Sequence, residues 1–111
     1  MALEAMSARL TIRLSASAVW HHKPAYAEIV HRAHAAGLAG ASVFHGFEGY
    51  GTHLEIHDDK PSRPRKHGPC GVVLIDTEDQ LRAFLDTLED ILSVNGVAVL
   101  DRVQVHLPAP R

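Results

Sequence analysis

Residues 8–15 alternate strictly between apolar and polar side chains, and this pattern restricts the fold more than any other feature of the chain. Leucine and isoleucine occupy the even positions from 10 to 14, whereas arginine and threonine occupy the odd positions from 9 to 13. Successive side chains of a β-strand point to opposite faces of its sheet, so this segment is predicted to be a strand with one dry face. Such a strand needs neighbours that cover only one face of the sheet.

A first amphipathic helix is predicted directly after this strand. Pro24 stands where a first helical turn tolerates a missing N–H, and apolar side chains then recur at spacings of three and four. Gly37 is suited to the C-terminal cap of this helix, since glycine adopts the left-handed conformation at low cost.

Residues 40–46 and 71–75 are rich in small and β-branched residues, and we interpret them as the second and third strands. The third strand is expected to be buried on both faces.

A second helix is the clearest local prediction. Thr77–Gln80 has the Ser/Thr-x-x-Glu/Gln form of a capping box, and apolar residues follow at helical spacing as far as Leu92. This pattern predicts one helix over that span. Asn95-Gly96 then turns the chain, and alternating valines over residues 97–105 predict the final strand, with an irregularity near Asp101.

The resulting order, β-α-β-β-α-β, predicts an α+β fold of the ferredoxin-like type. Two right-handed β-α-β units give a four-stranded antiparallel sheet with both helices on one face. The 111 residues suffice for one core, so residues 1–111 are predicted to be a single domain. Because the third and fourth strands look apolar on both faces, we expect the uncovered face to meet another subunit in a homo-oligomer.

Composition narrows the functional class. The net charge of −2, with histidines neutral, argues against non-specific binding of nucleic acid. No apolar run is long enough for a membrane-spanning helix, and no secretory signal is visible at the start. The lone Cys70 cannot form an intramolecular disulfide, and a cytoplasmic location is therefore expected.

Residues 47–70 are predicted to be a long flexible loop. Pro61, Pro64 and Pro69 fall in this stretch together with few large apolar residues, so a continuous helix or strand is not expected.

Several motifs resemble one known family. Trp20 and Lys23-Pro24 precede the first helix, Ala36–Ala41 (Ala-Gly-Leu-Ala-Gly-Ala) joins it to the second strand, and Gly46–Gly51 (Gly-Phe-Glu-Gly-Tyr-Gly) follows that strand. These motifs closely resemble the DUF190 family of PII-like bacterial proteins, and the similarity extends over residues 7–106. The segment Pro61–Pro69 departs from the aliphatic or polar stretch that family members have before the third strand.

The resemblance implies a ferredoxin-like protomer and a homotrimer whose sheets face inward. It also implies that residues 47–70 resemble the T-loop of PII proteins, which bind adenine nucleotides in clefts between subunits and contact a target through that loop. Because relatives in the wider PII-like group bind other ligands, the identity of the ligand does not follow from the resemblance.

Two clusters are the candidate ligand-binding groups. The glycines among residues 46–51 let backbone amides converge on an anion, although a plain glycine-rich exit from a strand accounts for them equally well. Four cations within residues 60–66 suit a phosphate clamp or an acidic docking partner, although a solvated loop is the plainer interpretation. The predicted ligand-binding residues are Gly46, Phe47, Glu48, Gly49, Tyr50, Gly51, Lys60, Arg63, Arg65 and Lys66.

Histidines provide the main alternative. His31 and His34 share a helix face, while His53 and His57 lie near the carboxylates of Glu55, Asp58 and Asp59. Two ligands do not make a zinc site, so no metal site or cofactor is predicted.

No catalytic set is found, and the chain is predicted not to be an enzyme. Cys70 precedes an apolar strand, where a buried and inert thiol is expected. Trp20 is expected to cap the core or a subunit seam, with stacking on a ligand ring as the alternative.

The leading hypothesis is a PII-like signalling protein. It binds a small anionic ligand, with an adenine nucleotide as the first candidate, and contacts a protein partner, such as a membrane transporter, through the 52–70 loop. The alternatives are a metal-binding or metal-tolerance module and a ligand-free adaptor for a membrane transporter.

Overall fold

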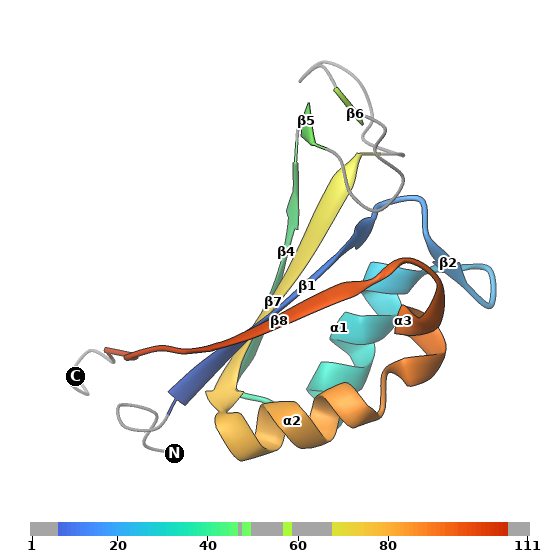
Figure 1. The fold of residues 1–111 in the computed structure, drawn as a ribbon. Helices are drawn as coiled ribbons and strands as arrows, with labels where there is room; N and C mark the ends of the chain where they lie inside the picture. The colour runs from blue at the N-terminus through green and yellow to red at the C-terminus, as the bar shows by residue number, and fades with distance from the viewer. Residues whose placement is uncertain (1–6, 47, 50–56, 59–67, 107–111) are drawn as a thin grey trace, which may run out of the picture.

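The computed structural model describes residues 7–46, 48–49, 57–58 and 68–106, which form a four-stranded antiparallel sheet covered by helices on one face (Figure 1). The strand order is β4-β7-β1-β8. The sheet strands are β1 (Ser7–Ser15), β4 (Gly40–His45), β7 (Pro69–Thr77) and β8 (Val97–Arg102), and the helices are α1 (Ala25–Ala35), α2 (Glu78–Asp86) and α3 (Glu89–Asn95). The ferredoxin-like α+β prediction is therefore confirmed.

The alternation in β1 sets the position of the core. Ala8, Leu10 and Ile12 are fully buried against the helices, whereas Arg9 and Arg13 on the opposite face are exposed. β1 lies in the middle of the sheet, paired with β7 on one side and β8 on the other. The core is completed by buried side chains from the helical layer and from β7, including Ile29, Val72, Leu74, Leu81 and Leu88.

The first helix ends as predicted. Gly37 has a φ of 74°, and its N–H donates to the carbonyl of His34 at 3.1 Å, while the N–H of Leu38 donates to the carbonyl of Ala33 at 3.1 Å. These two bonds form a Schellman motif, in which glycine is favoured because a side chain at positive φ is strained.

A short hairpin before α1 was not predicted. β2 (Val19–Trp20) pairs with β3 (Lys23–Pro24), and His21 and His22 form the two-residue turn with φ values of 46° and 69°. Two-residue hairpin turns with positive φ usually contain Asn-Gly or Asp-Gly. A His-His pair therefore does not indicate a hairpin turn in the sequence. The left-handed conformation costs about 1–2 kcal/mol for each of these residues.

The prediction of one continuous second helix was wrong. Thr77 does cap the helix, accepting a hydrogen bond from the Gln80 N–H at 3.3 Å, but α2 ends at Asp86 and α3 begins only at Glu89. At the break, the Thr87 hydroxyl donates to the carbonyl of Phe84 at 2.6 Å. Leu88 remains fully buried through the break, which is why the apolar spacing continues across it.

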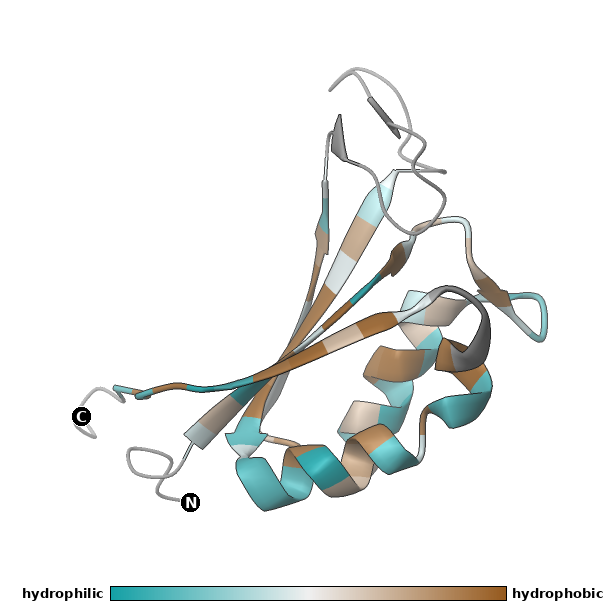
Figure 2. Cartoon of the chain, in the orientation of Figure 1, coloured by the Kyte–Doolittle hydropathy of each residue, from teal (hydrophilic) through white to brown (hydrophobic). Residues whose placement is uncertain are grey.

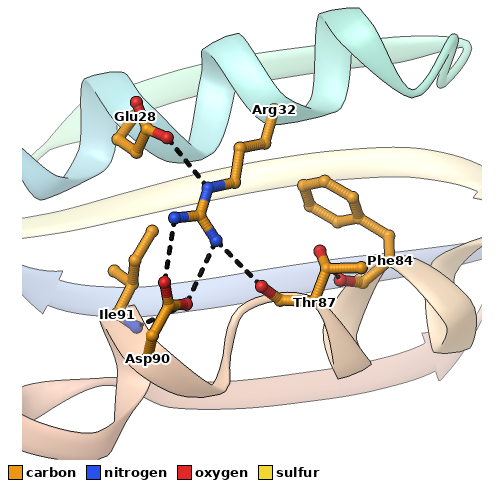
Figure 3. A network of polar contacts seen from close by, with 6 residues as sticks. All are labelled: Glu28, Arg32, Phe84, Thr87, Asp90 and Ile91. Atoms are coloured by element: carbon orange, nitrogen blue, oxygen red, sulfur yellow. Dashed lines mark hydrogen bonds and ion pairs between the residues drawn. The ribbon is translucent and has the colours of Figure 1, made fainter.

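Arg32 connects α1 to this break (Figure 3). Its guanidinium donates to Glu28 on its own helix at 2.9 Å, to the carbonyl of Thr87 at 2.8 Å, and to both carboxylate oxygens of Asp90 at 3.1 and 3.0 Å. It also lies 5.3 Å from the centre of the Trp20 ring. One side chain thus joins the hairpin, α1 and the α2–α3 junction, and a planar fork of donors suits this role better than a lysine would.

Acid should weaken the Arg32 contacts. Hydrogen bonds from Arg32 lower the pKa of Glu28 below its ordinary 4.5 and that of Asp90 below its ordinary 3.8. A carboxyl group whose pKa is lower in the folded protein stabilises the fold above its unfolded pKa, and this contribution is lost as the pH falls through the folded value. We expect the urea midpoint of unfolding to fall between about pH 5 and pH 2, and to fall less steeply in Arg32→Gln.

Arg13→Gln is the matched control, because Arg13 forms no ion pair with any of the described residues. It should keep the steep acid dependence of the unmodified protein. Equal slopes for Arg32→Gln and the unmodified protein would contradict the role of Arg32.

Candidate functional site

The candidate site begins where β4 leaves the sheet at Gly46. The N–H of Gly46 donates to the carbonyl of Pro69 at 2.8 Å, and a Cβ at position 46 would lie 2.7 Å from Cγ of Pro69. Only glycine fits this approach, because real Cβ atoms do not come so close to a rigid ring. The amide of Gly46 is therefore engaged within the protein and is not a free donor for an anion.

The third strand starts earlier than predicted. β7 begins at Pro69, so the last two residues of the expected 47–70 loop belong to the sheet, and the strand continues to Thr77. Proline is tolerated at the first position of a strand, where its missing N–H breaks no ladder bond. This pairing holds Pro69 against Gly46.

Beyond Gly46 the chain forms a small ladder above the end of the sheet (Figure 1). β5 (Glu48–Gly49) pairs with β6 (His57–Asp58), with Gly49 opposite His57. The segment expected to be an irregular loop thus contains two short strands that pair with each other. Gly46, Glu48 and Gly49 are brought together at this end of the molecule. The other predicted site residues lie outside the described residues: Phe47, Tyr50, Gly51, Lys60, Arg63, Arg65 and Lys66.

His45 was missed as a candidate. It is opposite the buried Cys70 in the β4–β7 register, so its side chain lies on the helix-covered face. Its ring meets Tyr26 edge-to-face at 5.3 Å and 89°. Its Nδ1 is buried and has no hydrogen-bond partner in the described part of the chain. The alternation of β4 could have identified His45, because it places this histidine at a core-facing position directly before the glycine segment.

Trp20 and Cys70, two other residues singled out from the sequence, both lie in or against the hydrophobic core. Trp20 packs against the core, with His21 4.3 Å from its ring and Arg32 over it, which favours the capping role. Cys70 is buried as predicted, and burial raises the pKa of its thiol, which keeps it protonated.

The histidine pairs do not form a metal site in the described part of the chain. His31 and His34 are exposed on α1, and across residues 7–46, 48–49, 57–58 and 68–106 no group of three or more histidine, cysteine or carboxylate side chains is arranged to hold a metal. His53, Glu55 and Asp59 lie outside the described residues.

The uncovered face of the sheet combines exposed apolar side chains on β4 and β8 with the arginines of β1, of which Arg9 is paired with Asp101. Phe44, Val97 and Val99 are 62%, 47% and 49% exposed, and Figure 2 shows apolar residues recurring along β8. One row across the sheet runs through Phe44, Gly71, Arg13 and Val97. Val73 and Ile75 of β7 are half-buried, so the expected burial of this strand on both faces is complete on only one face of the single chain.

The architecture described above is a PII-like fold. A nitrogen regulatory PII-like protein, CPII from Thiomonas intermedia K12, bound to ADP, AMP and bicarbonate, superposes with a TM-score of 0.68 at 17% identity, covering 89% of this chain and 87% of that chain. The divalent ion tolerance protein CutA1 from Ehrlichia chaffeensis superposes with a TM-score of 0.59 at 13% identity, covering 91% and 84%. At these identities the likeness concerns the fold alone.

Sequence comparison assigns the family. The family model of DUF190, described as "Uncharacterized ACR", matches residues 7–105. A UPF0166 protein from Aquifex aeolicus (strain VF5) is 36% identical over 83 residues, which is 75% of this chain and 77% of that protein. The chain belongs to the DUF190 family, and the resemblance noted from its motifs is confirmed.

None of the helices in the described ranges is long and apolar enough to cross a membrane.

The close approach of Gly46 to Pro69 gives a sharp test. Gly46→Ala should lower the free energy of unfolding by about 1–3 kcal/mol, because the added Cβ forces a backbone shift at the start of the glycine segment. Gly40→Ala is the matched control at the other end of β4, where an added Cβ meets no atom within 4 Å. Urea denaturation measures both changes, and equal stabilities of the two variants would contradict the argument.

Proposed function

We propose that this protein is a PII-like regulatory protein that binds a small anionic ligand at the segment beginning at Gly46, with an adenine nucleotide as the first candidate. The observation that carries the proposal is the position of this segment: Gly46, Glu48 and Gly49 follow His45 at the end of a PII-like sheet, and the buried Nδ1 of His45 has no hydrogen-bond partner among the described residues. The ADP and AMP bound to CPII, which shares the fold, support a nucleotide.

The chemistry of these residues suits an anion. Closely spaced glycines allow backbone amides to approach a phosphate closely, although the amide of Gly46 itself is engaged with Pro69. His45 can donate one hydrogen bond from Nδ1 when protonated there. The four cations of residues 60–66 add arginine forks that match phosphate oxygens. Binding would then bias the conformation of the loop predicted over residues 52–70, and a partner would respond to this change.

The proposed partner interaction uses the same segment. Its lysines and arginines suit an acidic surface on another protein, a membrane transporter being the first candidate class, and the protein would act in the cytoplasm.

The active form is proposed to be a homotrimer whose open sheet faces meet. The exposed Phe44, Val97 and Val99 give this face apolar surface to bury, and Gly71 leaves a gap beside Phe44 that a side chain of another protomer can enter. β4 is an edge strand without a charged residue or a proline, and such an edge readily pairs with another chain. A head-to-tail contact of this kind closes into a ring of three when each protomer is rotated by one third of a turn from the last.

Ligand binding is tested by thermal shift and calorimetry on tag-free protein with ATP, ADP, AMP and bicarbonate. We expect a saturable response to at least one nucleotide, because a ligand at a hundred times its dissociation constant stabilises the folded state by about 2.7 kcal/mol. Gly49→Val should abolish this response, whereas Gly40→Ala, at the far end of β4, should retain it. No response to any nucleotide would reject an adenine nucleotide as the ligand.

Assembly is tested by light scattering coupled to size-exclusion chromatography. The unmodified protein should have the mass of a trimer, and Phe44→Asp should dissociate it, because a carboxylate would be buried at the sheet interface. Val19→Asp is the matched control, since Val19 is 67% exposed but lies on the β2–β3 hairpin. A monomeric unmodified protein, or a trimeric Phe44→Asp, would contradict the proposed interface.

A further inference from the structure

The helical layer carries a groove on the side of the molecule away from the open sheet face. It lies between the C-terminal half of α1 and the outer face of α2, and its volume is about 460 Å³. We call it the helical groove, and its lining residues are Arg32, Ala35, Ala36, Leu38, Gln80, Ala83, Phe84 and Thr87.

Small side chains keep this groove open. Ala35 and Ala36 line it from the end of α1, and Ala83 lines it from α2, all three being exposed. Phe84, which is only 4% exposed, contributes to the lining from the core side. Because alanine reaches only one carbon beyond the backbone, the side chains of a docked segment could come close to both helices and contact an apolar surface.

One end of the helical groove is acidic. Thr87 also lines a second depression of about 790 Å³, together with Asp86, Glu89, Asp90 and Leu92. Asp90 is held by Arg32, whereas Asp86 and Glu89 form no ion pair with any described residue. Three carboxylates, Asp86, Glu89 and Asp90, line this end against one arginine, Arg32, so negative charge dominates there.

We propose that the helical groove docks an amphipathic basic segment of a partner protein. Apolar side chains of that segment would enter between Ala36 and Ala83, and its lysines or arginines would lie against Asp86 and Glu89. An apolar groove with an acidic end favours an amphipathic basic chain, because each part of the surface then meets its complement. The proposal goes beyond the ligand site, which lies at the other end of β4 and β7.

The arrangement also argues against a contact between the helical faces of two copies of this chain. The arginine of α1, Arg32, is already bonded to Glu28 and Asp90, and the arginine of α2, Arg82, is paired with Glu78. The described helices therefore offer no unpaired arginine or lysine to meet Asp86 and Glu89 of another copy.

A display library of randomised peptides, long enough for about four helical turns, tests the proposal on the full-length protein. The selected peptides should have apolar residues at helical spacing and lysine or arginine toward one end. Their affinity, measured by fluorescence anisotropy, should fall at least about tenfold in the double variant Asp86→Lys/Glu89→Lys. It should also weaken with added salt, since the charges lie at the surface.

Two further variants separate the groove from simple attraction between charges. Ala83→Gln partly fills the groove without changing charge and should also weaken binding by about tenfold. Asp79→Lys changes an acid of the same helix that lines neither depression, and should leave affinity within about twofold. Circular dichroism and melting temperature confirm that each variant is folded.

Several outcomes would overturn the proposal. These are a selection that enriches no peptide, enriched peptides without a basic bias, and binding that Ala83→Gln leaves unchanged. A fall in the mass of the protein itself on Ala83→Gln would instead assign the groove to contact between copies of this chain. None of these outcomes depends on nucleotide binding, so failure here and failure of the proposed ligand site are distinguishable.

Discussion

The structure depends on the burial of one face of β1. This central strand places its even-numbered side chains in the core and its arginines on the other side, so every helix must return to the same face of the sheet. Both crossovers then cover the core side, and the opposite face keeps Phe44, Val97 and Val99 exposed in the single chain. These exposed apolar side chains are a direct consequence of how the core is built, and they are the reason to expect self-association.

The helical layer is held together by polar contacts as well as by the core. Apolar packing places α1 and α2 on the sheet, but the two helices leave a groove between them instead of closing over it. Arg32 spans the end of that gap and satisfies the carbonyl of Thr87, which the break between α2 and α3 leaves without a helical partner. The break, the arginine and the acidic end of the groove belong to one arrangement, because Asp90 holds Arg32 while Asp86 and Glu89 face solvent.

Hydrophobic periodicity predicted the sheet strands and α1, since burial of an apolar face stabilises each of them. The capping-box motif predicted the cap at Thr77. Periodicity could not predict the break after Asp86, because Leu88 stays in the core while Thr87 and a distant arginine decide the backbone path. The His21-His22 hairpin was not predicted for a different reason, because its turn consists of residues that rarely adopt positive φ. At the candidate site, the structure bonds the amide of Gly46 to the carbonyl of Pro69, so Gly46 does not offer the free donor that the glycine pattern predicted. His45 could be found only by following the strand alternation to its end.

The two ends of the segment between residues 46 and 68 are anchored at one point of the sheet. The N–H of Gly46 donates to the carbonyl of Pro69, and the N–H of Ala16 donates to the carbonyl of Gly68, so both ends are tied to rigid strands. Closing a long segment on such a base costs entropy that grows only slowly with its length, which leaves the length between the anchors free to vary without loss of the core. A ligand held at this base, as proposed, would act on the segment at its attachment point and would not need to deform the sheet.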